Sequence, residues 1–321
     1  MPLVSVITRT RNRPDLLRRA ARSLAQQTFR DLQWIVADDS TDAAAVEPAL
    51  AEARRSGFAV RLCRVANPAG MESASNQGLV LADTPYVTFL DDDDTWEPSF
   101  LAETVSFLDA RGTFAGVCTQ TSVVEETADR DPTALRKYVM NEDLESIQIA
   151  DMMVFNHLTT NSLLYRRAVH DRLGPYREDL PVMGDWEFGI RLVTAYDIGV
   201  IAKPLANYHR RIGAGDAPAA YANTVTSLPG LHAETDALLR NELLRKEWAE
   251  GRIGPGHLMA LARIQLRADR LNQFHFHDIR AALDRHLGPP PSRDIATTDR
   301  PVSRSPTSPR RLLRRLLGCD S

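Results

Sequence analysis

Four consecutive carboxylates, Asp91 to Asp94, directly follow a short apolar run at residues 86–90 that is rich in β-branched and aromatic side chains. Such a run predicts a buried strand. Like charges at the end of a core strand repel each other, and a divalent cation is the usual compensation. Oxygen ligands suit hard ions such as Mg²⁺ or Mn²⁺, which in turn bind substrate phosphates. We therefore expect a metal-assisted phosphate site here, and the alternative is a solvated acidic turn.

The elements that position this cluster alternate regularly along the first ninety residues. Alternating or continuous apolar patterns predict strands, and apolar residues at helical spacing predict the helices between them. The predicted strands are 3–8, 32–37, 60–65 and 86–90, and the predicted helices are 16–27, 46–56 and 72–82. Strand–helix alternation at this spacing implies parallel βαβ units. In open sheets of this kind ligands bind beyond the carboxyl ends of the strands, which is where Asp91 to Asp94 would lie.

The second half of the chain is more varied. The patterns predict helices at 99–110, from 168 onward and at 184–195, strands at 116–124, 162–165 and 198–201, an unpatterned lid or insertion at 128–149, and helices within 221–287. From residue 288 the chain is rich in Pro, Ser and Arg, which predicts disorder. Its end, residues 310–317, alternates Arg pairs with Leu pairs. That pattern suits an anionic membrane surface, and the alternative is a solvated or partner-docking tail.

Composition sets broad limits on the function. The net charge of −3 provides no global basic field, so we expect no nucleic-acid partner. The three cysteines have no metal-ligand spacing and suggest no disulfide framework, which fits a reducing cytoplasm. We see no signal peptide and no apolar stretch long enough for a spanning helix, so we expect a cytoplasmic protein, with peripheral membrane contact through residues 310–317 as an open alternative.

The ordered set of motifs resembles the family 2 glycosyltransferases of the GT-A fold over residues 2 to 211. The matching segments are Val4 to Pro14, Asp38 to Asp42, Asn76 to Gly78, Asp91 to Asp94, Gly184 to Phe188 with Arg191, and Tyr208 to Arg211. The resemblance implies an α/β fold, namely a Rossmann-like mixed sheet flanked by helices, here with a C-terminal helical extension. It also implies transfer of a sugar from a nucleotide diphosphate to an acceptor hydroxyl with inversion.

The resemblance assigns most of the polar motif residues to the donor and the metal. It places the donor nucleotide against Thr8, Thr10, Arg11, Asp38, Asp39, Asn76, Asp91 and Asp92. A carboxylate such as Asp39 can accept a hydrogen bond from a base imino N–H, whereas the alternative for the Asp38–Asp39 pair is a helix-capping turn. The implied Mn²⁺ or Mg²⁺ ligands are Asp93, with Asp91 nearer the ribose or a metal-bound water, and His209. Arg191 and Arg211 are candidates for contacts with the diphosphate.

The resemblance makes Asp185 the base that removes the acceptor proton. A carboxylate within hydrogen-bond reach of a hydroxyl can do this as the nucleophile attacks. The alternative is an acid favoured in a first helical turn by the helix dipole. Two positions depart from the family pattern: Gly184 stands where an acid is usual, and Ser75 stands where an arginine is frequent. The missing arginine could be supplied by Arg9, Arg11 or Arg13 in the first loop.

These observations together predict a metal-dependent inverting hexosyltransferase that uses a nucleotide-sugar donor, with UDP favoured, and a glycan or lipid-linked acceptor in surface polysaccharide biosynthesis. The alternatives are a nucleotidyltransferase and an inactive nucleotide- or glycan-binding module of the same fold. We divide the chain into a catalytic domain at 1–215, a helical region at 216–287 and a basic tail at 288–321. The long helical patterns after residue 221 leave an oligomer open.

Overall fold

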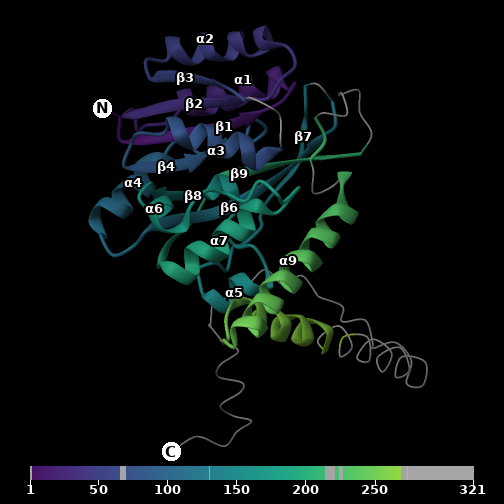
Figure 1. Cartoon of the computed structure of the whole chain (residues 1–321). Helices are drawn as coiled ribbons and strands as arrows, with labels where there is room; N and C mark the ends of the chain where they lie inside the picture. The colour runs from purple at the N-terminus through teal and green to yellow at the C-terminus, as the bar shows by residue number, and fades with distance from the viewer. Residues whose placement is uncertain are drawn as a thin grey trace, which may run out of the picture. The chain divides into compact units, whose positions relative to one another are not determined.

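The computed structural model describes residues 2–65, 70–129, 131–213, 221–223, 227–268 and 273 (Figure 1). Residues 1–267 form one compact unit, which contains all the predicted site residues. The predicted tail at 288–321, including 310–317, and the predicted helical residues 274–287 lie outside the described residues. The division of the chain at residues 215 and 287 stays a prediction.

A mixed nine-stranded sheet forms the centre of the unit (Figure 1). Its strands are β1 (Val4–Thr10), β2 (Leu32–Asp38), β3 (Ala59–Arg64), β4 (Tyr86–Phe89), β5 (Thr95–Trp96), β6 (Gly116–Thr127), β7 (Ala134–Val139), β8 (Leu163–Arg166) and β9 (Ile198–Ile212). The order is β3-β2-β1-β4-β8-β6-β9-β5, and β7 pairs with β6 off this path. Strands β1 to β4 are parallel, whereas β8 is antiparallel to both of its neighbours. The predicted βαβ half and the mixed sheet are both confirmed.

Helices cover both faces of the sheet because strand side chains alternate between them. They are α1 (Pro14–Ala25), α2 (Glu47–Arg55), α3 (Met71–Leu81), α4 (Phe100–Ala110), α5 (Ile149–Val154), α6 (Val169–Leu173), α7 (Gly184–Ala195) and α9 (Pro229–Glu250), with short 3-10 turns η1 (Ala43–Val46) and η2 (Thr160–Ser162). On β1, Val4 and Val6 join one core cluster with α1, α2 and α4, whereas Ile7 joins a second cluster with α3, α5, α6 and α7.

The C-terminal helices of the described region belong to the second core cluster. Leu239 of α9 and Met259, in the helical stretch 255–268, are fully buried among residues of α5 and α7. The guanidinium of Arg240 lies 4.8 Å from the ring of Trp186 and donates to the backbone oxygen of Met153 at 3.0 Å. The predicted helical character is thus observed within the described part of 221–287. No helix among the described residues is long and apolar enough to cross a membrane.

Two predictions need correction, and one short strand was not predicted. Residues 128–149 contain β7, which forms a hairpin with β6, where the sequence indicated only an unpatterned lid. The two-residue strand β5 gives no periodic signal of its own. Strand β9 continues to Ile212 and so includes the Tyr208–Arg211 motif, well beyond the predicted end at 201. The alternating pattern of β9 is interrupted at Pro204, where the register with β6 shifts around Gln120. Proline is tolerated in a strand at such an irregularity.

Candidate active site

The carboxyl ends of the central parallel strands meet at one edge of the sheet and border a cavity of about 290 Å³. The register aligns Thr10 of β1 with Asp38 of β2, and Ile7 with Phe89 of β4, so the loops after these strands start at the same edge. The cavity is lined by Arg9, Thr10, Arg11, Arg13, Asp39, Gly70, Met71, Glu72, Ala74, Asp91, Asp93, Thr160, Met183, Asp185, Tyr208, Ala222, Asn223 and His232. Six of the predicted site residues therefore face one space: Thr10, Arg11, Asp39, Asp91, Asp93 and Asp185.

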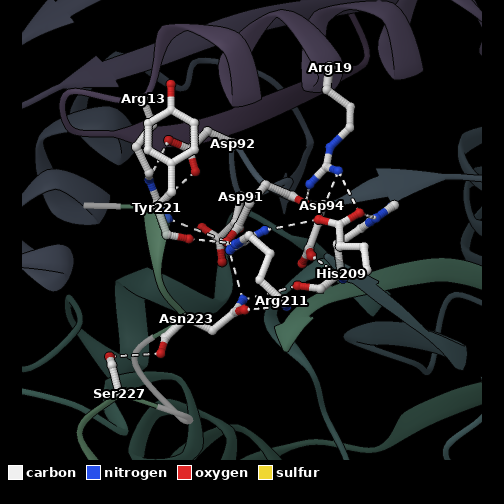
Figure 2. A network of polar contacts seen from close by, with 12 residues as sticks. Arg13, Arg19, Asp91, Asp92, Asp94, His209, Arg211, Tyr221, Asn223 and Ser227 are labelled. Carbon is white, nitrogen blue, oxygen red and sulfur yellow. Dashed lines mark hydrogen bonds and ion pairs between the residues drawn. The ribbon is translucent and has the colours of Figure 1, made fainter. Parts of the chain in front are cut away.

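The acidic cluster is neutralised in this structure by arginines from distant parts of the chain (Figure 2). Arg9 binds Asp91 with both nitrogens of its fork, Nε to Oδ1 at 2.9 Å and Nη2 to Oδ2 at 2.8 Å. Arg13 pairs with Asp92 at 2.8 Å and reaches Asp93 at 3.4 Å. Arg211 also pairs with Asp93, and its side chain is only 2% exposed. Although burial opposes ionisation, Arg13 and Arg211 hold the pKa of Asp93 below its usual range.

Asp94, the last acid of the cluster, and His209 both form hydrogen bonds with other groups of the protein. Asp94 accepts hydrogen bonds from the Asn161 side chain at 2.8 Å and from the His209 backbone at 3.0 Å, and burial raises its pKa. The His209 ring lies between Glu126, at 2.9 Å from Nδ1, and the Thr95 hydroxyl, at 2.9 Å from Nε2. Burial lowers the pKa of His209 despite the neighbouring Glu126. A metal ion at His209 would therefore have to displace a protein partner, and the nitrogen ligand stays a prediction.

The remaining donor set still fits a hard divalent cation. Among the described residues no three His, Cys, Asp or Glu side chains are grouped as a closed metal site. Mg²⁺ is usually held by only one or two carboxylates together with water and substrate phosphates. Asp91 and Asp93 both line the cavity and could provide that number, while Arg9 and Arg13 lie beside them as cations for phosphate oxygens.

Asp185 is held rigidly at the start of α7. Its Oδ1 accepts from the backbone N–H of Trp186 at 2.8 Å, and its Oδ2 accepts from Asn156 at 3.1 Å and from the Thr160 hydroxyl at 3.2 Å. Burial raises the pKa of Asp185, since the hydrogen bonds and Arg9 compensate only in part. A carboxylate held by three hydrogen bonds beside a cavity is positioned to accept a proton from a hydroxyl group bound there.

Several residues that the resemblance assigned to the donor or the diphosphate do not line the cavity. Thr8 is fully buried and accepts from the Trp34 indole N–H at 2.8 Å. Asp38 is buried too, bonds the Ser40 backbone at 2.8 Å and pairs with Arg64. These two side chains stabilise the sheet edge, and the carboxylate that reaches the cavity is Asp39.

Four more residues that the resemblance assigned to the donor or the diphosphate also bind other groups of the protein: Asn76, Arg191, Asp92 and Arg211. Asn76 binds both backbone groups of Tyr176, at 2.9 Å each. Arg191 pairs with Glu187 at 2.7 Å and donates to two backbone oxygens. Asp92 and Arg211 lie beneath the cavity and do not line it, since each is buried against the opposite charge described above.

Sequence reasoning missed Glu72 and the C-terminal contributors Asn223 and His232. Glu72 resembles an ordinary first-turn acid of α3, so no local signal marks it. Its burial raises the pKa to about 7 despite the nearby Arg9. Arg9 lies next to position 75, since its Nη1 donates to the Ser75 hydroxyl at 3.3 Å, and its role in place of the absent arginine stays a prediction.

The fold and the cavity define a glycosyltransferase of the GT-A type. Among solved structures, that of S. aureus TarS 1-349 in complex with UDP-GlcNAc matches with a TM-score of 0.51 and 20% identity, covering 66% of this chain and 60% of that chain. A sequence profile described as "Glycosyl transferase family 2" matches residues 5–174. The chain belongs to this family.

Curated relatives match at 23% to 37% identity over parts of this chain. The uncharacterized glycosyltransferase YwdF of Bacillus subtilis is 23% identical over 195 residues, which are 61% of this chain and 69% of YwdF. The O-antigen biosynthesis protein RfbC of Myxococcus xanthus is 25% identical over 66% of this chain, a match that spans only 16% of RfbC. The GalNAc(5)-diNAcBac-PP-undecaprenol beta-1,3-glucosyltransferase of Campylobacter jejuni is 37% identical over 29% of this chain and 30% of its own length.

Proposed function

We propose that this protein is a metal-dependent, inverting glycosyltransferase that moves a sugar from a nucleotide-diphosphate donor, with UDP favoured, to a hydroxyl of a glycan or lipid-linked acceptor in surface polysaccharide biosynthesis. The observation that carries the proposal is the convergence of Asp39, Asp91, Asp93 and Asp185 on one cavity at the edge of the sheet. The names of the relatives, which include O-antigen and undecaprenol-linked glycan synthesis, favour this class of acceptor.

The donor end of the proposed site is the part formed by β1, β2 and β4. Asp39 lies 3.7 Å from Arg11 and would accept a hydrogen bond from the imino N–H of the base. Arg9 and Arg13 would bind diphosphate oxygens, and Arg is suited to this because its planar fork matches phosphate geometry. Asp91 and Asp93 would hold the Mn²⁺ or Mg²⁺ ion, which when bound supplies Lewis-acid stabilisation of the charge on the departing diphosphate.

The acceptor end is the part around Asp185. In the proposed reaction the Asp185 carboxylate accepts the proton of the acceptor hydroxyl while the hydroxyl oxygen attacks the anomeric carbon. The new glycosidic C–O bond forms as the bond from that carbon to the diphosphate oxygen breaks, and the electron pair leaves with the nucleoside diphosphate. Attack from the face opposite the leaving group inverts the anomeric centre. Asn156 and Thr160 keep the carboxylate oriented for this step.

Thermal-shift measurements with UDP, GDP, dTDP and CMP, each with and without Mn²⁺, test the donor half of this proposal. A ligand that binds the folded state raises the melting temperature by mass action. We expect a shift with one diphosphate that requires Mn²⁺ and is lost in Asp93→Asn. Arg191→Gln is the matched control, because Arg191 lies outside the cavity. The absence of any Mn²⁺-dependent shift would reject the proposed donor site.

Turnover in Asp185→Asn separates an enzyme from an inactive binding module of the same fold. We expect the variant to bind nucleotide and lose at least about 100-fold in turnover, the scale of general-base catalysis. The tight pairing of Asp93 with Arg211 is the observation that keeps the inactive alternative open. Equal product formation by the wild type and Asp185→Asn would reject the catalytic role of Asp185.

A further inference from the structure

Glu72 is a buried acid that lines the cavity, and the proposed mechanism gives it no role. It lies in the first turn of α3 and is 4% exposed. Its Oε1 is 3.6 Å from Arg9, and its Oε2 accepts from the Ser75 hydroxyl at 3.3 Å. Neither contact is a bidentate ion pair, because the guanidinium of Arg9 forms its bidentate contact with Asp91. The carboxyl group of Glu72 therefore keeps hydrogen-bonding capacity for a molecule in the cavity.

The position of this carboxyl group is defined by Gly184, the residue before the proposed base. A Cβ built on Gly184 would lie 2.5 Å from Cδ of Glu72 and 2.6 Å from its Oε1. The backbone of Gly184 is outside the positive-φ region, so close approach of Glu72, and not chain conformation, excludes a side chain here. Glu72 thus places an acid from α3 in the space that a side chain on α7 would otherwise fill.

Two carboxyl groups consequently face the same end of the cavity, Glu72 from α3 and Asp185 from α7. They are close enough for the negative charge of Asp185 to help raise the pKa of Glu72, after the larger effect of burial. A carboxyl group that titrates near neutrality can either donate or accept a hydrogen bond. A pair of acids of which only one is needed for proton removal is suited to a ligand with two neighbouring hydroxyl groups.

We propose that Glu72 is an acceptor-binding residue that hydrogen-bonds a second hydroxyl of the acceptor, next to the hydroxyl that Asp185 deprotonates. The acceptor class is accordingly a sugar residue with a vicinal diol, and not an isolated alcohol. This inference rests on the proposed function. The proposed role belongs to the carboxyl group and does not depend on its attachment to α3. A carboxyl group attached to position 184 should therefore replace that of Glu72.

The test is a kinetic comparison of Glu72→Ala, Gly184→Asp and the double variant with the wild type. The probes are UDP-glucose, UDP-galactose, UDP-N-acetylglucosamine and GDP-mannose as donors, with p-nitrophenyl glycosides and their single-deoxy analogues as acceptors. We expect Glu72→Ala to raise the acceptor KM about tenfold or more, as the loss of a hydrogen bond to a charged group predicts. It should also remove the preference for the diol over the deoxy analogue.

The double variant tests whether a carboxyl group at position 184 can replace that of Glu72. Gly184→Asp alone should be impaired because its side chain meets Glu72, whereas Gly184→Asp with Glu72→Ala should return the acceptor KM to within about threefold of the wild type. Glu145→Ala, which removes an exposed carboxylate outside the cavity, is the matched control. A purely structural role for Glu72 would change kcat or stability without altering the discrimination between diol and deoxy acceptors.

The outcomes distinguish this inference from the function on which it rests. Transfer by the wild type with an unchanged acceptor KM in Glu72→Ala overturns the role of Glu72 alone. Donor hydrolysis without transfer to any glycoside overturns the assignment of a sugar diol as acceptor. A wild type that neither hydrolyses nor transfers any donor overturns the proposed function itself.

Discussion

The buried carboxyl group of Glu72 makes a prediction about stability that needs no substrate. Its pKa rises from an ordinary value of 4.5 to about 7 in the folded protein. The folded state therefore binds this proton more tightly than the unfolded state does. The resulting stabilisation is fully present below pH 4.5 and is lost as the pH rises through about 7. Glu72→Gln removes the titrating group while preserving its size.

The magnitude depends on the two pKa values. A shift from 4.5 to about 7 corresponds to about 3 kcal/mol in total. Most of this, roughly 2.5 kcal/mol, is lost between about pH 5 and pH 8, because the protonated fraction of the folded state falls over that interval. The free energy of unfolding of the wild type, minus that of Glu72→Gln, should therefore be more positive at pH 5 than at pH 8 by roughly 2.5 kcal/mol. Neighbouring acids that titrate in both proteins largely cancel in this difference.

Urea denaturation followed by tryptophan fluorescence and by circular dichroism measures this difference. Coincident transitions of the two signals would justify a two-state treatment. Glu145→Gln provides the matched control, because it removes an exposed carboxylate and should give a difference that is flat within about 0.5 kcal/mol. A difference for Glu72→Gln that is equally flat from about pH 5 to pH 8 would refute the buried, proton-binding state of Glu72.

Two further predictions concern residues that the structure takes out of the donor site or places beneath it. Arg211→Met leaves Asp93 and Glu126 buried without their shared cation, and should cost about 3–5 kcal/mol of unfolding free energy in urea at neutral pH. An unchanged denaturation midpoint would contradict this. Thr8→Val removes the acceptor of the Trp34 N–H and should cost about 1–3 kcal/mol, with nucleotide Kd by calorimetry within about twofold of the wild type. A large loss of nucleotide affinity at full stability would instead return Thr8 to the donor site.

The parallel half of the sheet was predictable because its signals are local. Apolar runs of strand length and helical spacing over residues 3–90 define β1 to β4 with α1 to α3, and parallel strands put their carboxyl ends at one edge. That argument correctly brings Asp39 and Asp91 together. Asp185 lines the same cavity. Its place there was predicted only by the family resemblance, since α7 is far away in the sequence.

What could not be predicted is which polar residues of each motif face the cavity. Thr8 and Thr10 lie two residues apart on β1, yet the first binds Trp34 in the core and the second lines the cavity. Arg211 reaches Asp93 because β9 continues past Pro204, and the register shift at that point conceals the strand from a periodicity argument. Partner choice of this kind depends on contacts between different elements of the fold, which are 26 positions apart for Thr8 and Trp34 and 118 positions apart for Arg211 and Asp93.

The packing of α9 bears on how freely the parts of this chain could be exchanged during evolution or in chimaeras. Arg240 lies over the ring of Trp186, which directly follows Asp185, and Leu239 belongs to the same core cluster. A graft that replaced the C-terminal helices with those of a relative would uncover an aromatic surface immediately behind that carboxylate. We therefore expect the C-terminal helices to be exchangeable only together with α5 and α7, so that a hybrid would need its junction before α5 and not after β9.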